Sequence, residues 1–507
     1  MVAQGVLPIQ HKPETASSGT TGRAGLELYF ELMEASGFCR AVRDYVQVCG
    51  QQGWLDLQML LALISLNIAG GDCVDDIDRL EADGGVTAML RKVERFVLPR
   101  RERKRMKARW RRGRRRTLPS PSAILDWLGR FHDPAEEAKR EPGRAFVPAP
   151  TPGLQSLWRV NRTLLGFLQA HCPLTRATLD QDATLIESHK RQAYPCYKGF
   201  KAYQPLNCWL AEHGVVLHSE FRDGNVPAGS ENLRFLRESL DHAAELGIEK
   251  VALRSDSAAY QQDLLLFCGE GRDERFGVID FAISADVTQD FRQAVQQLPE
   301  TAWQPLVRTF DDGTTVHTEQ EWAEVCFVPA WVGHSTKRAD YRFIAIREPL
   351  YQLPLGDADQ LPFPTEEFSG RGAHKLFGLV TNLNDPGDRV IWWHRERCGK
   401  SEEAHAALKN DLAGGQMPSG LFGANAAWWA ITALAHNLNA IMKQVVLGEG
   451  WVTRRMKKLR FAIINIPGRV VSHARHLVLR LSADGQTLDF FSGARRRLLG
   501  LADSPPG

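Results

Sequence analysis

The stretch that decides the fold starts with RATLDQDATLI at residues 176–186, where polarity alternates and β-branched side chains are frequent. Two more β-type segments follow, KAYQPLNCWL at 201–210 and GVVLHSEFRDG at 214–224. A helical pattern, ENLRFLRESLDHAAEL at 231–246, then leads into a further strand, KVALRSD at 250–256. Three strands, a crossover helix and a strand predict a mixed sheet in an α/β fold.

The regions outside this stretch have different patterns. The first 150 residues have helical periodicity, and VPAPTPG at 147–153 has the composition of a hinge. Residues 274–391 are rich in strand patterns and tryptophan, and helical periodicity returns at 401–412 and 421–446. We therefore expect a helical, basic domain at 1–150, a core in two parts at 151–273 and 392–450, a β-rich insertion at 274–391, and a basic tail at 451–507.

The composition excludes several classes of protein. With 43% hydrophobic and 24% charged residues, the 507-residue chain has globular usage and the length of about three domains. No run reaches the roughly 18–20 apolar residues of a membrane span, so we expect no membrane partner. Nine scattered cysteines without a CxxC pair indicate reduced thiols, and without a GxxxxGKS/T segment we expect no nucleotide cofactor. The start of the chain lacks an export signal, which predicts a cytoplasmic protein.

The segment at 91–116, RKVERFVLPRRERKRMKARWRRGRRR, is strongly basic, with 15 lysines and arginines against two glutamates. A solvated helix face usually mixes both signs, and charge this one-sided repels itself unless a polyanion neutralises it. Arginine also pairs bidentately with phosphate oxygens. We therefore predict contact with nucleic acid, DNA or RNA, through ten of these side chains: Arg100, Arg101, Arg103, Lys104, Arg105, Arg111, Arg112, Arg114, Arg115 and Arg116.

Acidic residues in the predicted sheet and in a later helix suggest a site for phosphoryl chemistry. Asp180 and Asp182 lie two apart in a strand and project from one face, and Asp256 ends a second strand. Glu402 opens a helix, with Lys409 seven residues later on the same face. Such carboxylates can hold two Mg²⁺ ions about 4 Å apart for an in-line phosphoryl displacement. Aspartates also suit turns, and glutamate suits the first turn of any helix, so the spacing alone leaves both interpretations open.

At these residues the sequence resembles the DDE transposases of bacterial insertion sequences, in the branch with a β-rich insertion before the glutamate. LDQDAT at 179–184 matches the segment of the first aspartate, which assigns Asp182. LRSDSAAY at 253–260 matches the segment of the second, which assigns Asp256. The family's glutamate helix has tyrosine, two residues, arginine, three residues, glutamate, six residues and lysine. The matching positions here are His394, Arg397, Glu402 and Lys409.

The match in the glutamate helix departs from the family in two places. Histidine stands at the tyrosine position, and four residues separate Arg397 from Glu402 where the family has three. The neighbouring acids Asp180 and Glu403 are alternatives to Asp182 and Glu402. We prefer Glu402 because of its spacing to the lysine.

The resemblance implies an RNase H-like catalytic core behind a helical amino-terminal DNA-binding module. LNIAGGDCVDDIDRLEAD at 66–83 and LPSPSAILDWLGRF at 118–131 resemble that module. The resemblance also implies a catalytic triad that binds two Mg²⁺ or Mn²⁺ ions, formed by Asp182, Asp256 and Glu402. It further implies that Arg397 and Lys409 contact DNA phosphate.

The reaction that the resemblance implies has two steps. Metal-activated water nicks DNA at the terminal inverted repeats of the element, and the freed 3′-hydroxyl then attacks target DNA, with a homodimer assembled on the DNA. Relatives with such an insertion often cut the second strand through a DNA hairpin. The alternatives are a metal-dependent nuclease without strand transfer and a non-catalytic DNA-binding relic. The expected setting is the bacterial cytoplasm, at the nucleoid. Lys198 and Tyr203 are candidates for contact with DNA near the cut or for a plain hairpin surface.

Overall fold

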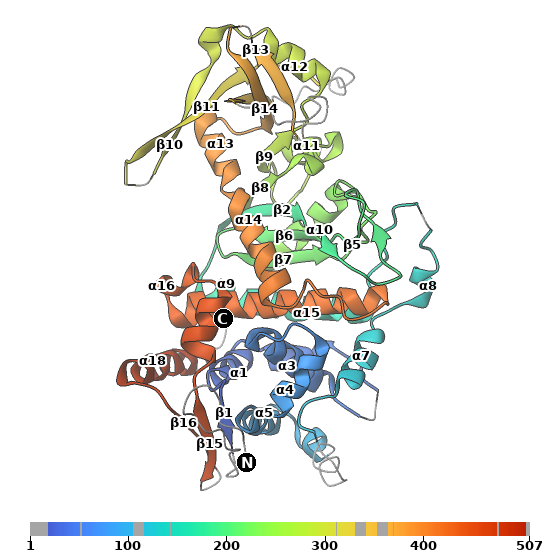
Figure 1. Cartoon of the computed structure of the whole chain (residues 1–507), viewed down its shortest axis with the longest axis vertical. Helices are drawn as coiled ribbons and strands as arrows, with labels where there is room; N and C mark the ends of the chain where they lie inside the picture. The colour runs from blue at the N-terminus through green and yellow to red at the C-terminus, as the bar shows by residue number, and fades with distance from the viewer. Residues whose placement is uncertain are drawn as a thin grey trace, which may run out of the picture.

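The computed structural model describes residues 19–50, 53–104, 116–141, 143–310, 312–329, 341–351, 363–368, 370–473 and 476–502. Its helices and strands form three levels along the longest axis (Figure 1). Helices from the amino-terminal part lie at one end, a mixed sheet occupies the middle, and a β-rich part forms the other end.

The middle level is the core of a ten-stranded mixed sheet, made of β2 (Arg176–Ala183), β6 (Leu206–Leu210), β7 (Val215–Glu220), β8 (Lys250–Ser255) and β9 (Asp280–Ala285). The strand order is β7-β6-β2-β8-β9. Strand β2 pairs antiparallel with β6 and in parallel with β8, and β8 pairs in parallel with β9. Helix α10 (Asn232–Glu245) crosses from β7 to β8. The predicted mixed sheet of an α/β fold is confirmed, and it is the sheet that the resemblance assigns to an RNase H-like core.

The sheet continues from the core into the β-rich part. Strand β9 lies within the range 274–391, but its parallel register with β8 makes it a core strand. A local sequence pattern indicates a strand but not the strand with which it pairs, which is why β9 falls within the predicted insertion. The predicted domain boundaries stay predictions. From β9 the sheet runs on through β14 (Gly372–Thr381), β12 (Arg342–Pro349), β11 (Thr315–Val325) and β10 (Gln304–Thr309), while β13 (Thr365–Phe368) pairs with β14.

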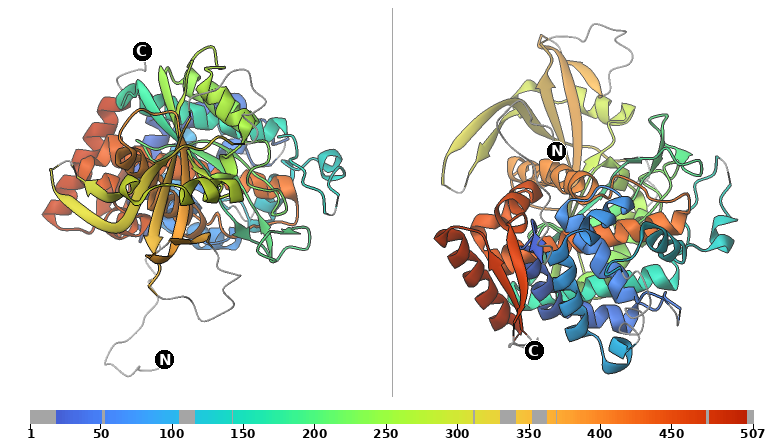
Figure 2. Two further views of the ribbon diagram at one scale, coloured as in Figure 1. Left: turned by 90° about the horizontal axis from the view of Figure 1, so that it is seen from above. Right: turned by 60° about the horizontal axis from the view of Figure 1, so that its bottom comes forward.

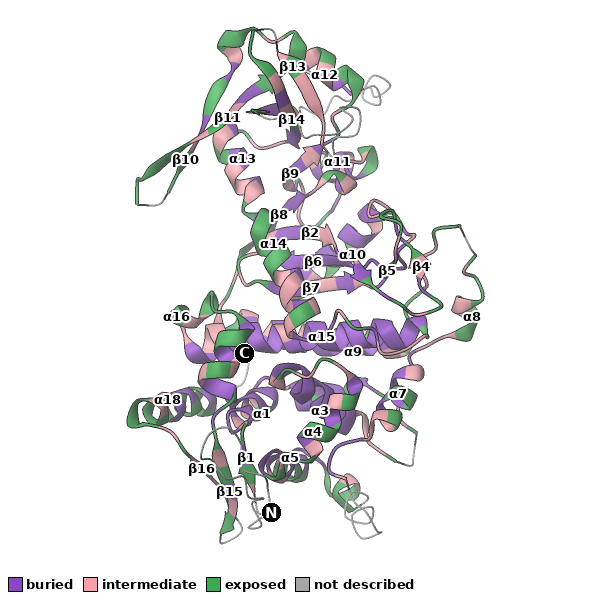
Figure 3. Cartoon of the chain, viewed as in Figure 1, coloured by how far each residue is buried: buried purple, intermediate pink, exposed green. Residues whose placement is uncertain are grey.

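Two long helices cover the core sheet on the side of β7. Helix α9 (Pro152–His171) is capped by Thr151, whose Oγ1 accepts a hydrogen bond from the Leu154 N–H. Helix α15 (Phe422–Ile441) packs along α9 and against β7. Nearly every residue of α15 is buried, because the amino-terminal helices pack on its opposite side (Figure 3). This is the environment expected for a helix that is apolar on all faces.

The helical periodicity of the amino-terminal part is confirmed at its helices. These are α1 (Leu26–Ala35), α2 (Phe38–Tyr45), α3 (Asp56–Ala69), α4 (Ile77–Glu81), α5 (Gly84–Val97), α7 (Pro121–Gly129) and α8 (Pro134–Glu137). Gly70, whose φ of 91° is left-handed, follows the last residue of α3, and the Ser120 side chain caps the start of α7. Among the described helices none alone is long and apolar enough to cross a membrane; α3 and the segment Val74–Glu81, bent by 97°, meet that requirement as a pair.

The carboxyl-terminal segment packs beside the amino-terminal helices. Strand β15 (Gly468–His473) pairs with β1 (Thr20–Thr21) on one side and with β16 (His476–Leu481) on the other. Helix α18 (Gly485–Ala502) lies against α1, where Arg495 pairs with Glu31 at 2.8 Å. Figure 2 shows these red elements next to the blue helices of the amino-terminal part.

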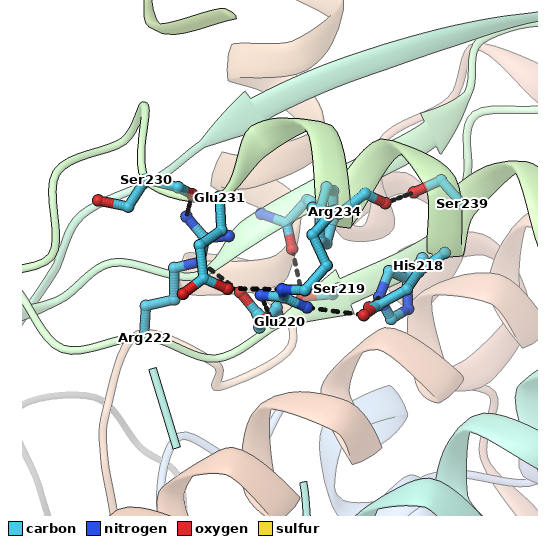
Figure 4. Close-up of polar contacts among 11 residues, drawn as sticks. His218, Ser219, Glu220, Arg222, Ser230, Glu231, Arg234 and Ser239 are labelled. Carbon is cyan, nitrogen blue, oxygen red and sulfur yellow. Dashed lines mark hydrogen bonds and ion pairs between the residues drawn. The ribbon is translucent and has the colours of Figure 1, made fainter. Parts of the chain in front are cut away.

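An ion-pair network fixes helix α10 to the sheet (Figure 4). Arg234 donates to Glu220 of β7 and, at 2.7 Å, to Glu238 of its own helix. His218 of β7 lies with its Nε2 3.1 Å from Glu238 Oε2. These contacts hold the helix that leads into β8. A cavity of about 440 Å³ opens beside the network, and neither aspartate of the predicted triad lines it.

Candidate active site

The two aspartates of the predicted triad leave the sheet at the same edge. Strands β2 and β8 are parallel neighbours in which Gln181 pairs with Ser255, and the next residues along the two strands are Asp182 and Asp256. Asp256 Oδ1 accepts a hydrogen bond from the Ala258 N–H at 3.1 Å, which fixes its side chain at the strand end. Burial raises the pKa of Asp256, and the negative charge of Asp182 raises it further.

Asp180, the alternative to Asp182, forms a buried ion pair. It faces Arg254 across β2 and β8 and accepts from the guanidinium Nε and Nη2 at 2.6 and 2.8 Å. Burial raises the pKa of Asp180, although Arg254 opposes the shift. Arg254 also donates to the Trp393 carbonyl at 2.7 Å. Both carboxylate oxygens of Asp180 therefore have structural partners, whereas Asp182 stands beside Asp256.

Helix α14 (Arg397–Ala406) meets Asp182 through an arginine and a serine. Arg397 Nη1 lies 3.2 Å from Asp182 Oδ2, and the Ser401 hydroxyl donates to the same oxygen at 2.7 Å. Glu402, the predicted third carboxylate, is exposed on the adjacent position of the helix. Glu403 is also exposed and pairs with Arg455 at 2.7 Å. On helix α14, Arg397 and Ser401 are thus in contact with Asp182. Neither Glu402 nor Glu403 contacts this aspartate.

The local geometry of α14 explains which residue meets the aspartate. Its first turn is broken, with ψ of 135° at Cys398 and φ of 83° at Gly399. The helix is followed by a π-helical turn at Ala407–Asp411, in which backbone hydrogen bonds join residues five apart and not four apart as in an α-helix. Three residues separate Arg397 from Ser401, which is the family's spacing from arginine to glutamate. The additional residue before Glu402 therefore leaves a serine at the glutamate position.

Lys409, the predicted phosphate contact of the glutamate helix, lies near the aspartate edge. It belongs to the π-helical turn, and its Nζ donates to the Leu185 carbonyl, just beyond β2, at 3.4 Å. Burial lowers the pKa of Lys409, the charge of Asp182 opposes this shift, and the charge of Lys198 adds to it. Arg397 and Lys409 together give the aspartate edge two cations that suit phosphate oxygens.

A buried hydrogen-bond chain that the sequence did not reveal supports the same edge. Trp429 Nε1 donates to Ser219 Oγ at 2.9 Å, and that hydroxyl donates to Asn207 Oδ1 at 2.6 Å. The Asn207 amide lies 3.2 Å from His405 Nε2, so this nitrogen accepts and the proton resides on Nδ1. His405 Nδ1 is 3.9 Å from Asp182 Oδ2. Burial lowers the pKa of His405 to about 3.

His394, which replaces the family's tyrosine, supports the second aspartate through the backbone. It lies on α13 (Gly387–Arg395), and its Nε2 is 3.0 Å from the carbonyl of Ser255, the residue before Asp256. Burial lowers the pKa of His394 to about 4, so near neutral pH it is an uncharged donor to that carbonyl. The spacing of Ser401 and His405, four residues apart after the break, is the sequence signal that points to this helix face.

The carboxylates of Asp182 and Asp256 are suitable ligands for a divalent cation. Two hard carboxylates lie at one edge, and the mutual charge that raises the pKa of Asp256 is relieved by a bound cation. Within the described ranges, no three His, Cys, Asp or Glu side chains gather closely enough to hold a metal ion. Asp182 and Asp256 therefore fit as two ligands, and Glu402 is not assembled with them.

The basic run is not part of this edge. Arg100, Arg101, Arg103 and Lys104 follow α5 and are exposed, and Arg116 pairs with Asp78. In Figure 1, α5 lies among the amino-terminal helices, on the far side of α15 from the core sheet. The remaining predicted nucleic-acid contacts fall outside the described residues: Arg105, Arg111, Arg112, Arg114 and Arg115.

Comparisons with known proteins identify the family. The sequence matches the family described as transposase DDE domain group 1 over residues 15–502. A cryo-electron microscopy structure of the piggyBac transposase synaptic complex with hairpin DNA is 9% identical, with 96% of this chain and 85% of that chain covered and a TM-score of 0.43. No curated protein sequence matches the chain. The family match spans nearly the whole chain, and the protein therefore belongs to the group 1 DDE-domain transposases.

Proposed function

We propose that this transposase cuts DNA at the terminal inverted repeats of its element and joins the freed ends to target DNA. The observation that carries the proposal is the shared edge at which Asp182 and Asp256 meet Arg397 and Lys409. Hydrolysis at the repeat boundary leaves a 3′-hydroxyl and a 5′-phosphate. Attack of that hydroxyl on a target phosphodiester forms the new bond and releases a target 3′-hydroxyl.

In this mechanism the chain's own residues hold the ions and the DNA. Asp182 and Asp256 would bind two Mg²⁺ or Mn²⁺ ions, which when bound supply an activated water and stabilise the leaving oxygen. Arg397 and Lys409 orient the phosphate by pairing with its non-bridging oxygens. Asn207 holds His405, whose Nδ1 lies 3.9 Å from Asp182 Oδ2, and His394 holds the Ser255 carbonyl next to Asp256.

Glu402 is the proposed third ligand. It follows Ser401 directly, and a turn of α14 by one residue, about 100°, brings Glu402 to the position from which Ser401 contacts Asp182. The break at Cys398 and Gly399 and the π-helical turn bound the segment that would turn. The proposal thus requires only the short helix between two irregular turns to move.

The partners follow from the reaction. Two element ends are joined in one event, so the proposed active form is a homodimer on DNA. The basic run at 91–116 is the proposed contact to the inverted repeats, because its charge needs a polyanion. The proposed setting is the bacterial cytoplasm at the nucleoid, where both the element and its targets lie.

The test incubates the purified protein with labelled DNA that carries the element's own ends, in Mg²⁺ and in EDTA. We expect metal-dependent cleavage at the repeat boundary, which Asp256→Ala abolishes and Asp290→Ala, an exposed aspartate of α12 (Gln289–Gln296), leaves intact. Joined products separate a transposase from a nuclease without strand transfer. Metal-independent binding without cleavage in all three proteins would overturn the catalytic proposal and leave a DNA-binding relic.

A further inference from the structure

A small sheet projects from the chain directly after the strand that carries Asp182. Its strands are β3 (Ile186–Glu187), β5 (Lys201–Tyr203) and β4 (Tyr194–Pro195), in the order β3-β5-β4. In Figure 1, β5 lies at the flank of the core sheet. Lys409 links the start of this segment to the active-site helix through the Leu185 carbonyl, so the sheet borders the aspartate edge.

The charge of this segment is one-sided. Lys190, Arg191, Lys198 and Lys201 stand against Glu187 between residues 186 and 203. In the described part of the chain none of these four cations pairs with a carboxylate. Lys190 and Lys201 donate to the carbonyls of Pro418 and Arg191, at 3.5 and 3.1 Å, which leaves their charge uncompensated. Unpaired cations beside a phosphoryl-transfer site complement a polyanion.

The segment also presents an aromatic ring to solvent. The Tyr197 side chain is 77% exposed, and Lys198 Nζ lies 5.7 Å from the centre of its ring. Tyr203, a candidate DNA contact in the sequence, is fully buried, and its hydroxyl accepts a hydrogen bond from Asn425 at 3.1 Å. Tyr203 therefore belongs to the core, and Tyr197 is the tyrosine available to a ligand.

We propose that this small sheet binds the DNA strand next to the reactive phosphate, with Tyr197 stacked on an unpaired base. Cations that follow the backbone and an aromatic ring that stacks on a base are the two elements of a single-strand binding surface. Stacking needs a base free of its partner, so the surface selects splayed ends over intact duplex. That the bound DNA strand lies next to the reactive phosphate rests on the proposed function. That the small sheet binds unpaired DNA does not.

The test compares two labelled DNA molecules of the same sequence, one a blunt duplex and one ending in unpaired nucleotides. Affinities are measured by fluorescence anisotropy in EDTA, where no cleavage occurs. We expect Tyr197→Ala to weaken binding of the splayed DNA about tenfold and to leave binding of the duplex unchanged. Tyr197→Phe keeps the ring and should retain wild-type affinity. Tyr351→Ala removes a tyrosine that is 76% exposed in the β-rich part and should change neither affinity.

The lysines are tested by salt dependence. Lys198→Gln should lower the slope of log affinity against log salt concentration for the splayed DNA by about 0.7. Lys250→Gln, at the exposed opposite end of the β8 strand, should leave the slope unchanged. Equal loss on both DNA molecules, or no loss in Tyr197→Ala, would overturn the inference. Absence of metal-dependent cleavage would overturn the proposed function alone, because these affinities need no cleavage.

Discussion

The strand side and the helix side of the site are built in different ways. Asp182 and Asp256 belong to parallel neighbours, so the hydrogen bonds of the sheet place both carboxylates at one edge. Glu402 lies on a short helix between a broken turn and a π-helical turn. The strand side holds its two aspartates together in this structure, whereas the helix side presents a serine in place of its glutamate.

The difference shows how sensitive a helix is to the count of residues. One extra residue in a strand can be absorbed by a bulge, but one extra residue before a helical position rotates it by about 100°. Ser401, which stands four positions after Arg397, meets Asp182 at 2.7 Å. The predictions below test whether the helix side turns during catalysis and what holds it in the observed arrangement.

The largest effect is expected from removal of the third carboxylate. If Glu402 joins the aspartates, Glu402→Gln lowers the rate of metal-dependent cleavage more than about a hundredfold, since loss of even a ligand's supporting partner costs 10–100-fold. Glu403→Gln removes only an exposed ion pair with Arg455 and should leave the rate nearly unchanged. The rates are measured on labelled element ends. Similar rates in the two variants would mean that the helix side supplies no ligand.

The contacts to Asp182 are compared next, by urea unfolding. Arg397→Gln should destabilise the protein by about 3 kcal/mol, because it leaves a largely buried carboxylate without its cation. Ser401→Ala removes one hydrogen bond and should cost about 1 kcal/mol. We also expect Ser401→Ala to retain cleavage, since the serine only holds the observed arrangement. A greater loss of stability in Ser401→Ala would show that the serine, not the ion pair, anchors the helix.

The break in α14 is tested by adding a side chain at its glycine. Gly399 has a φ of 83° and open space around it, so Gly399→Ala meets backbone strain without a clash and should destabilise by about 1 kcal/mol. Gly450→Ala, in α16 (Glu449–Val452) and without a left-handed φ, should not destabilise the protein. Thermal melting measures both. An unchanged midpoint in Gly399→Ala would mean that the break readily takes another form.

The smallest effect is expected from pH. The pKa of His405 is lowered to about 3 in the folded protein from an ordinary value of 6.5, so between these values the unfolded chain binds a proton that the native protein does not. The free energy of unfolding therefore falls as the pH drops through this window. Between pH 7 and pH 6 the free energy of unfolding should fall further in the wild type than in His405→Asn. The expected difference between the two falls is below about 1 kcal/mol.

Urea unfolding at the two pH values measures this difference. His317→Asn, at an exposed position of β11, is the control and should lose stability as the wild type does. An identical pH dependence in His405→Asn and the wild type would contradict the buried, neutral state of His405.

Much of the fold could be predicted because its signals are local. Alternating polarity marks β2, and a serine cap followed by proline marks α7. The membership in the DDE transposases is confirmed by the family match. The triad stays a prediction, because the structure assembles Asp182 with Asp256 but not with Glu402. Ser401 and Asn207 were missed because their contacts to Asp182 and His405 join positions 219 and 198 residues apart in the chain.

The sequence by itself determined the order of the elements, the acidic positions and the family. These follow from short-range patterns and motifs, which each stretch of chain carries alone. Tertiary structure gave the neighbouring acids different partners: Asp180 faces Arg254 across two strands, whereas Asp182 lies beside Asp256. It also decided that Tyr203 is core while Tyr197 is exposed. The physical reason is that burial and ion pairing depend on which distant segment packs against a side chain, and local sequence does not carry that information.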